Sequence, residues 1–174
     1  MKKTALVTDL KIIDSPQAGI GVARCLKEAN LSVLGADDTP FVTLNKELFK
    51  EVFCWEEIRT LNFDSLVSKL AKVKENFGLD YVFPCYDETA ILFSFIKDKL
   101  DYLKIKLISP PRETIKFIQK INLPNIANLQ NYKSPETKIA SSLQEAIDFA
   151  KMIGYPVVCK GRVKEVLFAL TRKN

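Results

Sequence analysis

The first 110 residues alternate between short apolar segments and amphipathic segments, and this alternation constrains the fold more than any other feature. Continuous apolar runs predict buried strands, and apolar positions repeated every three or four residues predict helices. Parallel strands need crossover connections, which helices supply. We therefore expect an α/β domain, Rossmann-like, with a parallel sheet covered by helices on both faces. The predicted strands are 4–8, 31–36, 52–55, 80–85 and 106–109, and the predicted helices are 18–29, one whose apolar face is Phe63, Leu66, Val67 and Leu70, and 90–103.

A different pattern follows residue 110. We expect a helix over 112–120, an Asn-rich segment over 122–132 that Pro124 breaks, and a short strand from Ser134 to Ala140. Ser141 and Ser142 cap a predicted helix over 143–153, and strands follow over 157–160 and 165–170. So few elements bury too little apolar surface to be stable alone. The predicted domains are therefore 1–110 and a small, incomplete α+β lobe over 111–174.

The 174 residues include no histidine, which excludes Ser-His and Cys-His nucleophile pairs and imidazole metal ligands. The cysteines at positions 25, 54, 85 and 159 show no C-x-x-C spacing, so we predict no metal site and expect free thiols in a reducing compartment. The net charge of +5 comes from scattered lysines, which argues against a nucleic-acid partner. Asp9 and Lys11 interrupt the apolar start, and no run approaches the ~20 residues that cross a bilayer. We expect a cytoplasmic protein with no membrane partner.

Two glycines stand where the loop after the first predicted strand enters a helix. Gly19 and Gly21 are placed to present backbone N–H groups to an anion, although a dinucleotide fingerprint needs a third glycine where this chain has Arg24. Asp37, at the end of the second strand, occupies the position of a ribose-binding carboxylate and equally suits a turn. These residues leave a nicotinamide-binding domain open as an alternative.

Acidic residues follow the fourth predicted strand, at the edge where open α/β sheets bind ligands. Asp87 and Glu88 stand directly after this strand, and the same acids also suit the first turn of a helix. The candidate substrate-binding residues are Gly19, Gly21, Asp87 and Glu88.

Lys160 is the last residue of a motif that is more specific than the glycines and acidic residues above. Residues 154–160 read G-Y-P-V-V-C-K and follow the predicted helix 143–153. On spacing alone Lys160 is the exposed end of an edge strand. The run nevertheless resembles the ATP-grasp superfamily signature, G-[FY]-P-[VL]-V-x-K after a helix of the type S-x-x-E-A-x-x-x-A. Gln119-Lys120 resembles the family's D-K pair with Gln for Asp, and residues 133–137 resemble its G-[IV]-x-x-P-x-T segment.

The first 110 residues are similar to the pre-ATP-grasp domain of carbamoyl-phosphate synthase large subunits and related carboxylate-amine ligases. The resemblance implies activation of a small carboxylate by ATP to an acyl phosphate, which an amine then attacks. It implies ATP and Mg²⁺ as cofactors of the complete protein, with Lys160 and Lys120 binding the nucleotide phosphates. The family's large lobe, with its acidic metal ligands, is expected after residue 174.

We therefore expect the amino-terminal part of an ATP-dependent ligase, with no turnover of ATP and no tightly bound cofactor in residues 1–174 alone. Two alternatives stay open. One is a non-catalytic assembly module of ATP-grasp ancestry, which associates with itself through an exposed face or pairs with a separate large-lobe chain. The other is a nicotinamide-dependent oxidoreductase domain that uses Gly19, Gly21 and Asp37.

Overall fold

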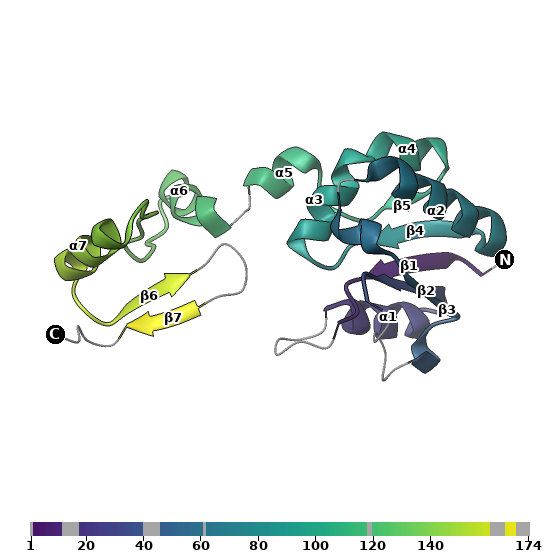
Figure 1. The fold of residues 1–174 in the computed structure, drawn as a ribbon, viewed down its shortest axis with the longest axis horizontal. Helices are drawn as coiled ribbons and strands as arrows, with labels where there is room; N and C mark the ends of the chain where they lie inside the picture. Colours follow the sequence, from purple (N-terminus) through teal and green to yellow (C-terminus); the bar gives the residue numbers. More distant parts are fainter. Residues whose placement is uncertain are drawn as a thin grey trace. The chain divides into compact units, whose positions relative to one another are not determined.

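The computed structural model describes residues 2–11, 18–39, 46–60, 62–117, 120–160 and 166–169. The chain divides into two compact units, Met1–Ile115 and Lys116–Asn174, whose elements are labelled in Figure 1. The domain boundary predicted at residue 110 lies just before this division. Each unit is described by itself below.

The first unit contains a five-stranded sheet in the order β3-β2-β1-β4-β5, and every neighbouring pair is parallel. The chain runs outward from β1 through β2 to β3 and then crosses to the other side of β1, where β4 and β5 follow. The gap between β1 and β4 is therefore the topological switch point of the sheet. The predicted parallel α/β sheet is confirmed. Its strands are β1 (Thr4–Thr8), β2 (Ser32–Asp37), β3 (Glu51–Cys54), β4 (Leu79–Phe83) and β5 (Lys106–Leu107).

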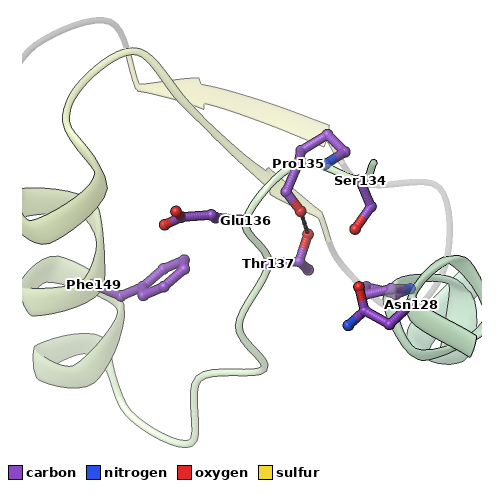
Figure 2. Close-up of a pocket in the computed structure, with 7 residues that line it drawn as sticks. Asn128, Ser134, Pro135, Glu136, Thr137 and Phe149 are labelled. Carbon is purple, nitrogen blue, oxygen red and sulfur yellow. Dashed lines mark hydrogen bonds between the residues drawn. The ribbon is translucent and has the colours of Figure 1, made fainter. Parts of the chain in front are cut away.

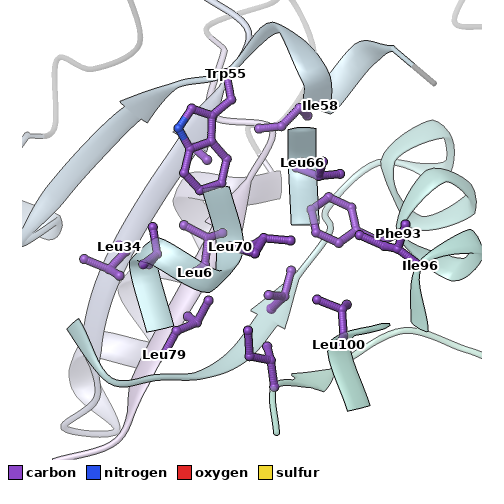
Figure 3. Packing of buried hydrophobic residues seen from close by; sticks show 14 of the residues in the cluster. Leu6, Leu34, Trp55, Ile58, Leu66, Leu70, Leu79, Phe93, Ile96 and Leu100 are labelled. Atoms are coloured by element: carbon purple, nitrogen blue, oxygen red, sulfur yellow. The ribbon is translucent and has the colours of Figure 1, made fainter. Parts of the chain in front are cut away.

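Helices cover both faces of this sheet because successive strand residues point to opposite sides. Leu6 and Leu34 face one side, where they join a core cluster that includes Leu70 and Phe93 (Figure 3). Val7, the neighbour of Leu6, joins a second cluster on the other side, against the first helix. Each large apolar side chain buried in this way contributes about 1.5–3 kcal/mol. The helices are α1 (Ala18–Glu28), α2 (Phe63–Phe77), α3 (Asp87–Phe95) and α4 (Lys97–Tyr102), with short 3₁₀ helices η1 (Lys46–Leu48) and η2 (Glu56–Arg59).

The single helix predicted over 90–103 is wrong, because the chain forms α3 and α4 with a break at Ile96. Ile96 has φ −107° and ψ 10°, and its N–H donates to Phe93 O at 3.1 Å instead of continuing the α-helical pattern. Ile96 and Leu100 are four residues apart and lie on the same side of the chain, and both are almost fully buried. A segment that is apolar on every side carries no periodicity to mark such a turn, so packing decides where it falls.

The second unit holds little core. Ala150 is its only described apolar residue that is buried. Its two strands pair antiparallel, with Val158 opposite Phe168 and Lys160 opposite Val166. The elements from the linking helix onward are α5 (Arg112–Phe117), η3 (Lys120–Asn122), α6 (Leu123–Leu129), α7 (Leu143–Ile153), β6 (Val157–Lys160) and β7 (Val166–Ala169).

Three predictions for this part of the chain are corrected. The expected strand ending at Ala140 does not form, because no described strand lies beside it to supply hydrogen bonds. The Asn-rich segment is helical instead of broken, because Pro124 lies in the first turn of α6, where no backbone N–H is required. In place of one helix over 112–120 the structure has α5 over Arg112–Phe117 and a 3₁₀ helix from Lys120, with Gln119 outside the described residues.

The first turn of α7 is held by reciprocal hydrogen bonds. Ser142 Oγ accepts from Glu145 N at 3.2 Å, and the Glu145 carboxylate accepts from Ser141 N at 2.8 Å and Ser141 Oγ at 2.6 Å. Lys138 Nζ lies 2.8 Å from the same carboxylate. Lys138 and then Ser141 lower the pKa of Glu145 to about 2. This capping box explains why α7 begins where the serine pair predicts.

We predict opposite effects of alanine at the two glycines of α1. Gly19 is buried, and a Cβ added there would overlap Thr8 O and lie 2.6 Å from Asp9 O, whereas a Cβ at Gly21 meets nothing within 4 Å. Gly19→Ala should lower the free energy of unfolding by about 1–3 kcal/mol through overpacking. Gly21→Ala should raise it by about 0.5–1 kcal/mol through helix propensity. Urea unfolding of both variants tests this, and a change of the same sign in both would contradict it.

We also predict a pH-dependent helix start at α7. The pKa of Glu145 in the folded chain lies below the ordinary 4.5, so its carboxylate stabilises α7 above about pH 4.5 and this contribution disappears as the pH falls to about 2. Lys138→Ala should raise this pKa toward 4.5, whereas the control Lys151→Ala should not, because Lys151 contacts Asp148. Titration of the Glu145 carboxyl carbon by NMR measures both. A midpoint near 4.5 in the unaltered chain would refute the assignment.

Candidate functional site

The carboxyl edge of the first unit's sheet gathers the polar residues that follow β1, β2 and β4. This is the edge at which open α/β sheets bind ligands. The sequence predicts Asp37, Asp87 and Glu88 at this edge. It does not single out Asp9 as a site residue, because in the sequence Asp9 only interrupts an apolar segment. The feature of the sequence that could have identified Asp9 is its position, because a carboxylate directly after a strand predicted to be buried must find hydrogen-bond donors.

Asp9 is fully buried at the switch point and joins β1 to the segment after β4. Its Oδ2 accepts from Thr8 Oγ1 at 2.7 Å, Cys85 N at 2.8 Å, Tyr86 N at 2.9 Å and Thr89 Oγ1 at 2.5 Å. The backbone of Asp9 has φ +64°, a left-handed conformation that Asp tolerates better than most residues. One carboxylate thus ties the end of β1 to the first turn of α3.

Asp37 plays a similar part at the end of β2. Its carboxylate is fully buried and accepts from the backbone N–H groups of Leu10 at 2.5 Å, Lys11 at 3.1 Å and Asp38 at 2.7 Å. In the nicotinamide-binding alternative this carboxylate must face a ribose. Here the chain's own backbone surrounds it, which argues against that role.

The two candidate glycines lie within the first turns of α1, beyond the loop. Gly19 is explained by packing, because the helix approaches the carbonyl oxygens of Thr8 and Asp9 so closely that no side chain fits. Gly21 is exposed. Gly19 therefore has no open surface for a substrate, and its position fixes α1 against the end of β1.

Asp87 and Glu88 are exposed in the first turn of α3. Acidic side chains are favourable there because the helix N-terminus carries partial positive charge. The next residue, Thr89, is buried and bonded to Asp9, so this turn is held at the rim of the switch point. The structure thus brings Gly19, Asp87 and Glu88 to the same edge of the sheet.

A thiol also lies at this edge, but it is not a nucleophile. Burial and then the neighbouring Asp9 charge raise the pKa of Cys85 to about 12. Its Sγ contacts Phe83 O at 3.5 Å. Because the thiolate is the reactive form, Cys85 stays protonated and inert at neutral pH.

Lys160 lies at the end of β6 in the second unit and is exposed. Its side chain makes no hydrogen bond or ion pair with a described residue, and its backbone pairs with Val166. Lys120 begins η3 in the same unit, although its side chain lies outside the description, as do residues 161–165. The structure therefore supports an accessible cation at Lys160 and says nothing of the Lys120 side chain.

A hollow of about 330 Å³ lies near the segment that resembles the family's P-x-T motif (Figure 2). Phe149 projects toward this segment from α7, and Asn128 approaches it from α6. Thr137 Oγ1 donates to Pro135 O at 2.9 Å and fixes the bend. The other residues that line the hollow are Pro124, Ser134 and Glu136. The hollow is open to solvent and its lining is mainly polar, unlike the enclosed, mostly apolar pockets that usually hold small ligands.

The described residues contain no group of three His, Cys, Asp or Glu side chains that fits a metal ion. No helix in the part of the chain that the structure describes is both long enough and apolar enough to cross a membrane.

No family model matches the chain. The arginine-specific carbamoyl phosphate synthase large chain of Halalkalibacterium halodurans is 22% identical to it over 150 residues. That match covers 82% of this chain and 14% of the relative. The chain therefore spans a small part of the curated protein that it matches.

Solved structures of biotin carboxylases have a similar fold. The biotin carboxylase domain of Hydrogenobacter thermophilus 2-oxoglutarate carboxylase, in complex with MgADP, ADP and bicarbonate, matches 97% of this chain and 37% of its own, with a TM-score of 0.60 and 16% identity. Campylobacter jejuni biotin carboxylase, in a β-γ-ATP complex, matches 97% and 38%, with a TM-score of 0.60 and 18% identity. The predicted likeness is thus found in sequence, to part of a carbamoyl phosphate synthase large chain, and in fold, to part of the biotin carboxylases.

Proposed function

We propose that this chain forms the amino-terminal part of an ATP-dependent ligase that activates a carboxylate as an acyl phosphate for attack by an amine. The sequence likeness to a carbamoyl phosphate synthase large chain supports this, as does the fold shared with biotin carboxylases that were solved with adenine nucleotides. The observation that carries the proposal is the exposed Lys160 at the end of β6, directly after α7 and a G-Y-P turn. We place the activity in the cytoplasm, where free thiols such as those of this chain persist.

Phosphoryl transfer from ATP moves negative charge onto phosphate oxygens, and a fixed cation lowers the energy of that transition state. Lys160 suits this role because its ammonium group is exposed and unengaged among the described residues. Pairing of Lys160 with Val166 in the β6–β7 ladder fixes its backbone. We propose Lys120 as the second phosphate-binding cation. The described residues supply no magnesium site, so we derive no step through that ion.

The acceptor substrate is proposed to meet the carboxyl edge of the first unit. Asp87 and Glu88 present two exposed carboxylates there, which favour an amine or ammonium group by charge. Gly19 serves this edge only indirectly, by letting α1 pack closely on β1.

We predict that Lys160→Ala, made in the protein as its gene encodes it, lowers ATP affinity or turnover by about 100-fold. A loss of this order is typical when one group that stabilises transition-state charge is removed. Substrate-dependent phosphate release and ATP titration calorimetry measure it. Lys151→Ala is the matched control, because it removes an exposed lysine of the same unit that contacts only Asp148. Unchanged ATP binding and kinetics, with unchanged circular dichroism, would show that Lys160 is only the exposed end of a strand and does not bind ATP.

A second candidate function, an assembly module, is favoured by exposed apolar side chains on the β6–β7 ladder. Val158 and Phe168 are directly paired across the strands and therefore share one face, and they are 50% and 70% exposed. Leu167 on the opposite face is 71% exposed. Apolar surface of this kind is typical of an interaction site, and we propose a second copy of the chain as its partner.

We predict concentration-dependent self-association in sedimentation velocity experiments. Phe168→Ser should weaken it, because it removes the largest apolar side chain of the paired face. Leu129→Ser, at an equally exposed position on α6, is the control and should leave it unchanged. A strictly monomeric chain at high concentration would refute the assembly proposal.

A further inference from the structure

The switch point of the first unit contains a complete set of anion-binding donors. Two consecutive backbone N–H groups, those of Cys85 and Tyr86, point at one oxygen position from the segment after β4. The hydroxyls of Thr8 and Thr89 donate to the same position from β1 and from the first turn of α3. We call these four donors the anion cradle.

Such a cradle has the chemistry that holds a phosphate or carboxylate oxygen in α/β proteins. Backbone N–H groups beside a helix N-terminus combine hydrogen bonding with the partial positive charge of the helix. The switch point is also where sheets of this order hold the anionic part of a ligand. In this chain the oxygen that fills the cradle is Oδ2 of Asp9.

Two features hold Asp9 in this position: its own backbone conformation and the close packing of α1. Its left-handed backbone, φ +64°, follows directly on β1, and the carboxylate is fully buried. Gly19 brings α1 against the carbonyl oxygen of Asp9, so the backbone cannot withdraw without moving that helix. An anion attached to the chain in this way has a high effective concentration and outcompetes free anions.

We propose that Asp9 is a built-in anion that takes the place of a ligand's phosphate or carboxylate in the anion cradle. The first unit therefore binds no phosphate at its switch point, and a ligand is confined to the rim at Asp87 and Glu88. This inference concerns the first unit alone and does not depend on Lys160 or on ATP. It also separates this chain from nicotinamide-binding domains, whose ligand needs the switch point open.

Two substitutions of Asp9 distinguish the effect of its negative charge from the effect of its backbone conformation. Asp9→Gly suits φ +64° and removes the carboxylate while leaving all four donors. Asp9→Asn also tolerates this backbone and keeps a carbonyl oxygen in the cradle without the charge. Formate is the probe, since it is a carboxylate small enough for the space that the side chain leaves. Sodium chloride at equal concentration controls for general salt effects.

The midpoint of thermal unfolding should fall in Asp9→Gly and recover by several degrees as formate is added, because a ligand that binds only the folded state stabilises it. The unaltered chain and Asp9→Asn should show no formate-specific rise. If Asp9→Gly does not stay folded at rest, its refolding from urea in formate and in chloride gives the same comparison. Equal responses to both salts in Asp9→Gly would overturn the proposal.

A second readout uses the unaltered chain. Neither inorganic phosphate nor formate should move the amide NMR signals of Cys85 and Tyr86, whereas in Asp9→Gly formate should shift them. Phosphate-dependent shifts of these two amides in the unaltered chain would show that its cradle is open and would overturn the proposal. Either failure leaves the Lys160 experiment unaffected, so the two ideas are tested separately.

Discussion

The first unit depends on one buried carboxylate that binds groups from three parts of the chain. A charged side chain removed from water is strongly unfavourable unless hydrogen bonds replace its hydration. Asp9 satisfies this condition with four donors from β1, the segment after β4 and α3. Those donors in turn hold α3 in place and position the acidic rim. Asp37 repeats the principle at the end of β2 with three backbone donors.

The two units differ in what holds them together. The first has apolar clusters on both faces of its sheet, whereas among the described residues of the second only Ala150 is a buried apolar side chain. Hydrogen bonds at the start of α7 and the β6–β7 ladder supply local order there instead. The same shortage of burial exposes both Lys160 and Phe168. Phosphate binding by Lys160 and assembly through Phe168 are thus both proposed for the unit whose described side chains are less buried.

Periodicity predicted the strands of the first unit well, because the central strands β1, β2 and β4 are short apolar runs that the sheet largely buries. It failed where the pattern was ambiguous. The apolar run around Ile96 is compatible with one helix or two, because it is apolar on every side, and the chain forms two. The segment before Ala140 has strand-like residues but no described neighbouring strand, so it stays irregular.

The sequence by itself determined the order of elements, the parallel sheet with helices on both faces and the resemblance around Lys160, because all of these rest on local spacing. Only the tertiary structure decided the roles of Asp9, Asp37 and Gly19. The partners of Asp9 after β4 lie 76 to 80 residues further along the chain, and two of the three partners of Asp37 lie 26 and 27 residues before it. Spacing along a sequence cannot reveal such contacts, because folding alone brings distant donors to one carboxylate.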